Sequence, residues 1–284
     1  MILINSIQLQ QLINLLLLVT LSYLNNTLQT TPLNIALLML YSGFLELSIK
    51  KEFYIPYSAF ITALGVVLML GWLKWYIPYV AITFGILQKH YWKIGGKHIF
   101  NPSNFALIVA IFLFYPKALP IVGELGKSNY IFYIVLLIGI SILIRVNRYI
   151  ITLSFLIAYS ILSYLILKEI DPTWNLEHFI SSLYSTSFVV FIFFMLTDPI
   201  TTPNSFLKQI FFGFFVALVI TLLNYFIGIR FWHQFLGLFI VSILFTPFYR
   251  ELQKEDFKKL LITIIFAIII VINFSIKKAL YFSM

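Results

Sequence analysis

The sequence predicts an all-α polytopic membrane protein with about 10–11 transmembrane helices. Of its 284 residues, 61% are hydrophobic and only 10% are charged, whereas soluble domains carry roughly 25% charged residues. The mean hydropathy is +0.99. Long apolar runs alternate with short polar breaks from one end of the chain to the other. These observations exclude a soluble globular protein and predict a single integral membrane domain over residues 1–284.

The apolar runs are expected to be helices, because they lack period-two alternation and backbone in lipid must satisfy its own hydrogen bonds. Segment 102–115 is short: at 1.5 Å per residue it covers roughly 21 Å of a hydrocarbon layer of roughly 30 Å, so it either crosses the membrane or re-enters from one face. In chain order, we place the helices near residues 9–24, 33–48, 56–73, 75–88, 102–115, 130–146, 148–167, 178–197, 206–228, 231–247 and 259–276.

The distribution of charge predicts the orientation of the chain. The first basic residue is Lys50, so the first apolar run has no basic region before it and is expected to be retained as a helix. Most Lys and Arg residues fall in loops on the side of the N-terminus, whether segment 102–115 crosses or re-enters, so the positive-inside rule predicts a cytoplasmic N-terminus. The net charge of +9 is therefore explained by topology and contact with lipid head groups, and nucleic-acid binding is not expected.

Composition also limits the chemistry of the protein. The chain has no cysteine, which excludes disulfides, thiolate metal sites and cysteine nucleophiles, so redox chemistry would require an organic cofactor. His90 and His98 lack carboxylate neighbours in sequence, and no metal site is predicted. No phosphate-binding glycine loop, catalytic triad or carboxylate pair is visible, so no catalytic residues are assigned and enzyme activity stays an open question.

The first informative polar break, residues 88–105, contains half of the histidines and opens a short helix. Pro102 stands at a first helical position and Asn101 at the preceding N-cap, which leaves backbone N–H groups that attract an anion. His90 and His98, with three lysines near them, could hold a flavin phosphate, a quinone carbonyl or a lipid head group. The alternative is a capped helix with a basic loop at the membrane interface.

The second break contains Thr197, Asp198 and Pro199, and repeats the arrangement of a polar residue followed by proline. Such breaks at corresponding points of two halves indicate an internal repeat with a site near the midplane. Thr197 and Asp198 could bind a flavin ring or line an ion path, or they could simply cap a helix. If segment 102–115 re-enters, the two breaks enter from opposite faces, as an inverted repeat requires; if it crosses, they enter from the same face.

Three other features have both a structural and a functional interpretation. Ser58 and Thr62 present hydroxyls one helical turn apart, which suits either a pore wall or close helix packing. Glu46 is expected to form an interfacial ion pair with Lys50 at i+4. The mixed-charge segment 250–259 is expected to be a solvated loop, or a docking surface for a neighbouring subunit.

These motifs resemble those of RnfD and NqrB, the membrane subunits of the RNF and NQR ion-translocating electron-transport complexes, over almost the whole chain. Residues 58–62 match the family's Ser-Ala-x-x-Thr helix. Residues 88–90 and 100–103 match its Gly-Lys-His and Phe-Asn-Pro-Ala stretches. Residues 193–203 match its Phe-Phe-x-Ala-Thr-Asp-Pro-Val-Thr-Ser-Pro signature.

The resemblance implies a fold of two inverted five-helix repeats, similar to urea transporters, with repeat 1 at about 1–128 and repeat 2 at about 129–284. It implies a subunit of the bacterial inner (cytoplasmic) membrane that associates with other membrane subunits. Such a subunit binds a flavin (FMN or riboflavin) or a quinone and couples electron transfer to ion transport. The candidate cofactor-binding residues are Ser58, Thr62, Lys89, His90, Asn101, Pro102, Thr197, Asp198 and Pro199.

The chain departs from the family at the flavin-attachment motif. Members that carry electrons attach FMN covalently to a threonine in a Ser-Gly-Ala-Thr motif, in the connection before the Thr-Asp-Pro helix. The corresponding connection here, 168–178, lacks this motif, and residues 184–187 (Tyr-Ser-Thr-Ser) align instead with a Ser-Gly-Gly stretch. Any bound flavin is therefore expected to be noncovalent. The alternative functions are a channel-like permease and a membrane scaffold that keep the fold without a redox cofactor.

Overall fold

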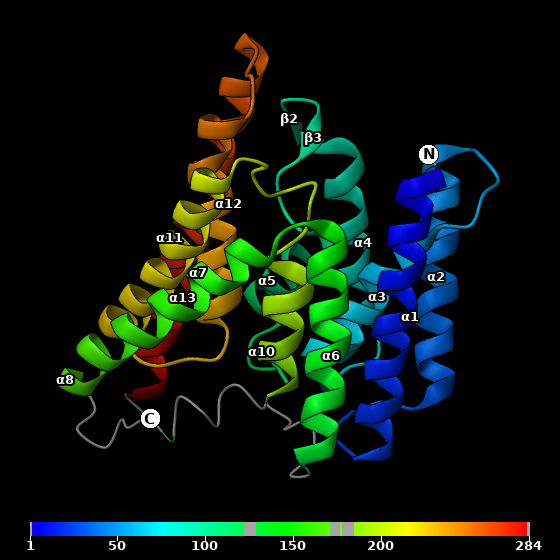
Figure 1. The fold of residues 1–284 in the computed structure, drawn as a ribbon, viewed down its shortest axis with the longest axis horizontal. Coiled ribbons are helices and arrows are strands. Elements are labelled where there is room, and N and C mark those ends of the chain that lie inside the picture. Colours follow the sequence, from blue (N-terminus) through cyan, green and yellow to red (C-terminus); the bar gives the residue numbers. More distant parts are fainter. Residues whose placement is uncertain (1, 122–128, 171–176, 178–184, 283–284) are drawn as a thin grey trace.

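The computed structural model describes residues 2–121, 129–170, 177 and 185–282, and helices dominate these parts of the chain (Figure 1). The first part contains α1 (Ile2–Leu24), α2 (Pro32–Lys50), α3 (Tyr57–Met69), α4 (Ile77–Tyr91), α5 (Pro102–Phe114) and α6 (Asn129–Val146). The second part contains α7 (Tyr149–Leu162), η1 (Ser163–Leu167), α8 (Lys168–Ile170), α10 (Thr186–Val190), η2 (Phe191–Met195), α11 (Phe206–Ile227), α12 (His233–Tyr249) and α13 (Lys254–Phe282).

Five of the described helices are long and apolar enough to cross a membrane. They span Ser6–Leu24, Pro32–Lys50, Tyr149–Ile166, Phe206–Ile227 and Lys254–Ser275. Shorter apolar helices, among them α3, α5 and α12, pack between the long ones (Figure 1). The prediction of an all-α polytopic membrane protein is confirmed. The boundaries expected for segment 178–197 fall partly outside the described residues.

One short strand pair was not predicted. Helix α3 ends at Met69, and β1 (Leu70–Trp72) pairs antiparallel with β4 (Ala118–Pro120), with Gly71 opposite Leu119. The expectation of a helix as far as residue 73 was wrong at this end. Gly71 permits the close approach: a Cβ there would lie 2.7 Å from Gln29 Oε1 and 3.4 Å from Leu119 O. The pairing is a tertiary contact with residues far along the chain, and local apolarity does not encode it.

A β-hairpin follows α4 at one end of the bundle (Figure 1). It consists of β2 (Lys93–Ile94) and β3 (Lys97–His98), which pair antiparallel. Its two turn residues, Gly95 and Gly96, have φ values of 60° and 74°. A two-residue hairpin turn with positive φ at both central positions strongly favours glycine. The hairpin therefore carries two lysines and a histidine within the polar break that precedes α5.

Helix α5 lies in the centre of the bundle, and its residues from Ser103 to Ile111 are buried. Two glycines let neighbouring helices approach it closely. A Cβ on Gly65 of α3 would lie 2.4 Å from Ser103 Oγ, and one on Gly85 of α4 would lie 2.6 Å from Pro102 O. This close packing fixes the position of the N-terminus of α5 relative to α3 and α4.

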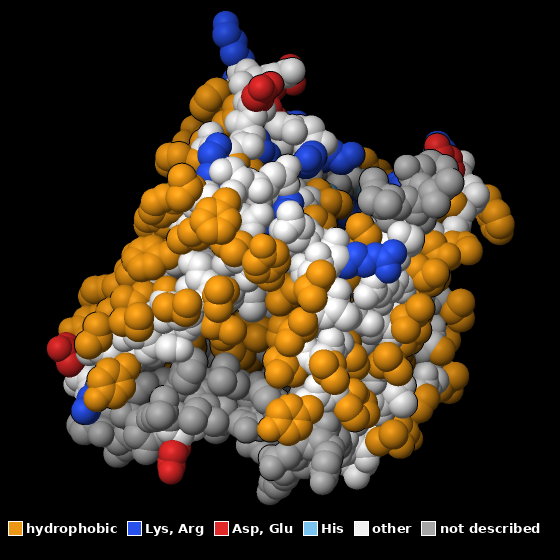
Figure 2. All heavy atoms as spheres, in the orientation of Figure 1, with side chains coloured by type: hydrophobic (Ala, Val, Ile, Leu, Met, Phe, Trp, Pro, Cys, Tyr) orange, Lys and Arg blue, Asp and Glu red, His pale blue; other side chains and the backbone are white. Residues whose placement is uncertain are grey.

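The loops that carry the two breaks lie at the same end of the bundle, the end that carries the hairpin (Figure 1). The second break follows η2, a π-helix that ends at Met195, and precedes α11. On the face shown in Figure 2, most Lys and Arg side chains gather at this end. Both the crossing and the re-entrant interpretation of segment 102–115 stay predictions, as does the division into two five-helix repeats.

Candidate functional site

The two polar breaks meet directly. Asn101 Nδ2 donates a hydrogen bond to Asp198 Oδ2 at 3.1 Å. Asn101 Oδ1 accepts from the backbone N–H groups of Ser103 and Asn104, both at 3.1 Å, so the asparagine caps α5 as its position before proline predicted. Asp198 Oδ1 accepts from Ile200 N at 3.0 Å. Both oxygens of this carboxylate therefore have donors, and the amide of Asn101 can adopt only one orientation.

Arg148, at the start of α7, donates hydrogen bonds to the loop between η2 and α11, which we call the Asp198 loop. Its Nε donates to Thr202 Oγ1 at 3.0 Å, and its Nη2 donates to Asn204 Oδ1. Thr202 Oγ1 in turn donates to Asp198 O at 2.6 Å. The Arg148 side chain is buried, so these contacts are shielded from solvent and fix the backbone of the break.

Arg250, at the end of α12, donates hydrogen bonds to the same loop and to the hairpin. Its guanidinium donates to the backbone carbonyls of Ile94, Lys97 and His98 of the hairpin, at 2.8–3.0 Å. It also donates to Ile200 O at 3.1 Å. Arg250 was expected in a solvated loop or a docking surface, and its contacts with the hairpin and the Asp198 loop were not predicted. Its position just after a helix is the only local signal, because its partners are about 50 and 150 residues away.

A buried ion pair lies beside the breaks. Lys89 Nζ of α4 contacts Glu46 Oε2 of α2 at 2.5 Å and donates to Ser58 Oγ at 2.8 Å. Tyr54 donates from its hydroxyl to Glu46 Oε1 at 2.8 Å. The expected pair of Glu46 with Lys50 exists only at 4.0 Å, and the Lys50 side chain is 41% exposed. The predicted pair of Glu46 with Lys50 is therefore present, and the shorter contact of Glu46 with Lys89 was not predicted.

Glu46 and Lys89 line a polar cavity of about 690 Å³ that lies beside the hairpin. His90 lines it, with its Nε2 buried 3.9 Å from Glu46 Oε1. Lys93 and Lys97 of the hairpin add two exposed ammonium groups to its wall. His98 is buried, and burial together with the positive charges of neighbouring residues, Lys89 first, lowers its pKa to about 3. The histidine is therefore neutral at pH 7, and the lysines provide the positive charge.

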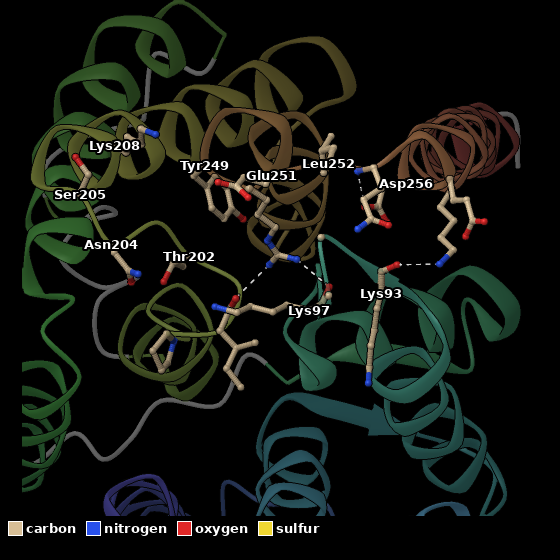
Figure 3. A pocket seen from close by; sticks show the side chains of 18 residues that line it. Lys93, Lys97, Thr202, Asn204, Ser205, Lys208, Tyr249, Glu251, Leu252 and Asp256 are labelled. Carbon is tan, nitrogen blue, oxygen red and sulfur yellow. Dashed lines mark hydrogen bonds between the residues drawn. The ribbon is translucent and has the colours of Figure 1, made fainter. Parts of the chain in front are cut away.

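A second cavity, of about 960 Å³, lies on the other side of the hairpin (Figure 3). Lys93, Gly96, Lys97 and Ile200 line both cavities, so the hairpin forms the wall between them. Figure 3 shows Lys97 reaching toward Thr202 and Asn204, below the Arg250 contacts. Both cavities are mixed in charge, because Glu251, Glu255 and Asp256 line the second and Glu46 and Glu52 line the first. The first cavity is the better candidate for a ligand, because Ser58, Lys89 and His90, which the sequence singled out, line it and Lys89 neutralises Glu46.

The structure brings together six of the residues that the sequence singled out. Ser58, Lys89 and His90 line the first cavity, and Pro199 lines the second. Asn101 and Asp198 join the breaks between the two cavities. These residues come from two helices and two loops, and they converge because the hairpin and the Asp198 loop lie at one end of the bundle.

The other three predicted residues belong to helix packing in the structure. Thr62 is buried and donates to Ser58 O of its own helix at 2.9 Å. Thr197 is buried and donates to Phe193 O at 2.7 Å. Pro102 packs its backbone against Gly85. Their part in cofactor binding stays a prediction, and the geometry favours the first cavity over a pore lined by Ser58 and Thr62.

The first cavity contains side chains that suit an anion. Within the described part of the chain, no group of three or more His, Asp or Glu side chains is placed to hold a metal. The first cavity instead offers ammonium groups, a buried imidazole nitrogen and tyrosine rings. Such donors bind phosphate or carboxylate oxygens.

Comparison with known proteins identifies one related family. Residues 118–247 match the model of the NQR2, RnfD, RnfE family. The matched range includes Arg148 and the Asp198 break, whereas Glu46, Lys89 and Asn101 precede it. No curated protein matches the chain significantly.

Proposed function

We propose that this chain, a family member of the NqrB/RnfD type by the match of residues 118–247, is a membrane subunit of an Rnf/Nqr-type electron-transport complex. The proposal includes binding of a noncovalent flavin or a quinone, and coupling of electron transfer to ion movement. The proposal of cofactor binding rests on the cavity of about 690 Å³ that lies beside the joined breaks. Its volume lies within the roughly 300–1,000 Å³ typical of cofactor sites.

The residues of this cavity fit an FMN molecule. Lys93 and Lys97 are exposed cations that suit the phosphate, and the ion pairs of the described residues leave them free, because all of these pairs involve Glu46. His90 Nε2 is buried and makes no hydrogen bond among the described residues. Tyr54 and Tyr57 line the same cavity and suit an aromatic ring system. A flavin would supply the electron chemistry, while the protein binds it and sets its electrostatic environment.

The Glu46–Lys89 pair supports the coupling part of the proposal. The two side chains are only 2% and 9% exposed, and charges in a region of low dielectric interact strongly with any charge placed beside them. A negative charge gained next to Lys89 would weaken the electrostatic attraction between Lys89 and Glu46. The carboxylate would then bind a cation more strongly, which is the requirement for linking a redox change to ion uptake.

The location of the basic end supports a cytoplasmic site. The hairpin, the end of α12 and the start of α13 lie at the end where α1 begins (Figure 1). By the positive-inside rule this end faces the cytoplasm, in a bacterial inner membrane, with the N-terminus on the same side. Under this proposal the cavity is open to cytoplasmic redox partners and to membrane subunits of the same complex.

The test is to purify an affinity-tagged full-length chain in mild detergent from cells that make an Rnf/Nqr-type complex. We expect other membrane subunits to copurify, and the visible spectrum to show a flavin. After acid precipitation, the flavin should appear in the supernatant, because no covalent attachment is expected. A colourless protein that copurifies with no such subunit would contradict the proposal and favour a permease or a scaffold.

A further inference from the structure

A third cavity, of about 470 Å³, opens sideways from the bundle toward the lipid. It lies between α4, α5 and α13, and its walls are almost entirely apolar. Its lining includes Phe84, Phe105, Phe266, Trp92, Ile262 and Gln88. Phe84 and Ile262 are exposed on the outer surface of the bundle, so the groove is accessible from the bilayer.

One polar atom in this apolar groove has no partner. Gln88 is 5% exposed, and its Nε2 donates to Phe100 O at 3.2 Å. That bond fixes the orientation of the amide, and Gln88 Oε1 is left buried with no hydrogen bond among the described residues. A buried acceptor without a donor costs about 1–3 kcal/mol. A ligand that brings a hydroxyl into the groove would remove this cost.

Positive charge lies at one end of the groove. Trp92 Nε1 donates to Thr263 Oγ1 at 2.9 Å and closes this end. Lys259 lies one helical turn before Thr263, with its Nζ 3.4 Å from the backbone oxygen of Lys93. The groove therefore combines an apolar channel, a buried acceptor and an adjacent cation. Trp and Lys side chains also favour the level of lipid head groups.

We propose that this groove is a binding site for an anionic phospholipid with a hydroxyl-bearing head group, the chemistry of phosphatidylglycerol. One acyl chain lies along the aromatic side chains, the phosphate lies near Lys259, and a head-group hydroxyl donates to Gln88 Oε1. This inference is independent of the flavin proposal, because no residue that lines the groove lines the first cavity and Lys259 is not assigned to the flavin phosphate.

The first test fills the groove. Ile262→Trp places a large ring at its mouth, while the matched control Ile265→Trp changes another exposed residue of α13 that does not line the groove. Both variants should unfold at the wild-type temperature. Phosphatidylglycerol titrated into the delipidated full-length protein is followed by native mass spectrometry. We expect Ile262→Trp to weaken binding by about tenfold or more, equivalent to about 1.4 kcal/mol, and Ile265→Trp to leave it unchanged.

The second test examines charge. A lysine near an anionic head group contributes about 1 kcal/mol, so Lys259→Gln should weaken phosphatidylglycerol binding about fivefold. Lys254→Gln, which changes an exposed lysine outside the groove, should have no effect. Phosphatidylcholine should bind more weakly than phosphatidylglycerol. Equal binding of the two lipids, equal affinities of the Ile262→Trp and Ile265→Trp variants, or extraction of a quinol from the groove instead of a phospholipid would overturn the proposal.

Discussion

At the scale of single residues, the hydrogen bond between Asn101 and Asp198 joins two breaks that are 97 positions apart in the chain. Each group has a fixed hydrogen-bonding role. Asn101 uses its oxygen to cap α5 and its nitrogen to reach Asp198, whose other oxygen accepts from Ile200 N. The contact therefore depends on a carboxylate at one position and an amide at the other.

Exchanging the two side chains separates hydrogen bonding from charge. Asp198→Asn alone turns one donor toward another donor and should lower the free energy of unfolding by about 1 kcal/mol. The double variant Asn101→Asp/Asp198→Asn restores every donor–acceptor pairing and places a carboxylate at the N-terminus of α5, which is favourable. We expect it to recover the unfolding temperature in detergent, but not the electron-transfer activity of the complex. Full recovery of activity would show that Asp198 acts only as a structural cap.

His98 provides a prediction about pH. Burial, followed by the charges of Lys89 and Arg250, lowers its pKa to about 3, whereas an unfolded histidine takes up a proton below roughly pH 6.5. The unfolded state therefore binds more protons between these values, and stability falls as the pH falls through this window. The loss should approach about 1.4 kcal/mol per pH unit below 6.5.

Thermal unfolding between pH 7.5 and 4.5 measures this effect. His98→Gln keeps a polar side chain of similar size and removes the titrating group, so its unfolding temperature should depend less on pH than that of the wild type. Identical pH profiles for the two proteins would show that His98 is not the source of the acid sensitivity.

At the scale of elements, the hairpin and the Asp198 loop are joined through Arg250. Four backbone carbonyls accept from one guanidinium. A lysine at this position lacks the planar fork and could satisfy fewer of them. The hairpin is only two residues long on each strand, so its own ladder contributes little and Arg250 should determine its stability.

Arg250→Lys should therefore loosen the hairpin without unfolding the protein. Hydrogen bonds to charged donors contribute about 1.5–3 kcal/mol, so amide exchange at residues 93–98 should accelerate about tenfold or more. Hydrogen-exchange mass spectrometry measures this change, and Arg230→Lys at another loop serves as the control. Unchanged exchange in the Arg250→Lys variant would contradict the assigned role of Arg250.

Features with a local sequence signal could be predicted, whereas contacts between distant residues could not. Helices were predictable because each depends on a local apolar run, and the Asn101–Pro102 cap was predictable because its signal is local. Glu46 was assigned to Lys50 because the i+4 spacing is visible in sequence, whereas its main partner Lys89 is 43 residues away. Contacts of this kind arise from tertiary packing, and a single sequence does not encode them in a recognisable pattern.

At the scale of the whole molecule, charge and polarity are concentrated at one end. The hairpin, both breaks and the two polar cavities lie there, while apolar side chains cover the sides of the bundle (Figures 1 and 2). The asymmetry was predictable from the positions of Lys and Arg in the sequence. The cavities were not, because they result from the way the hairpin lies between α2, α4 and α12.

The most direct test of the account compares FMN and riboflavin binding to the purified full-length protein. The two ligands differ only by the phosphate, so binding through Lys93 and Lys97 predicts that FMN binds about tenfold or more tightly than riboflavin. Lys93→Gln/Lys97→Gln should abolish this preference, and Lys254→Gln should retain it. If neither flavin binds, or if FMN and riboflavin bind equally to the wild-type protein, the basic cavity is not the flavin site.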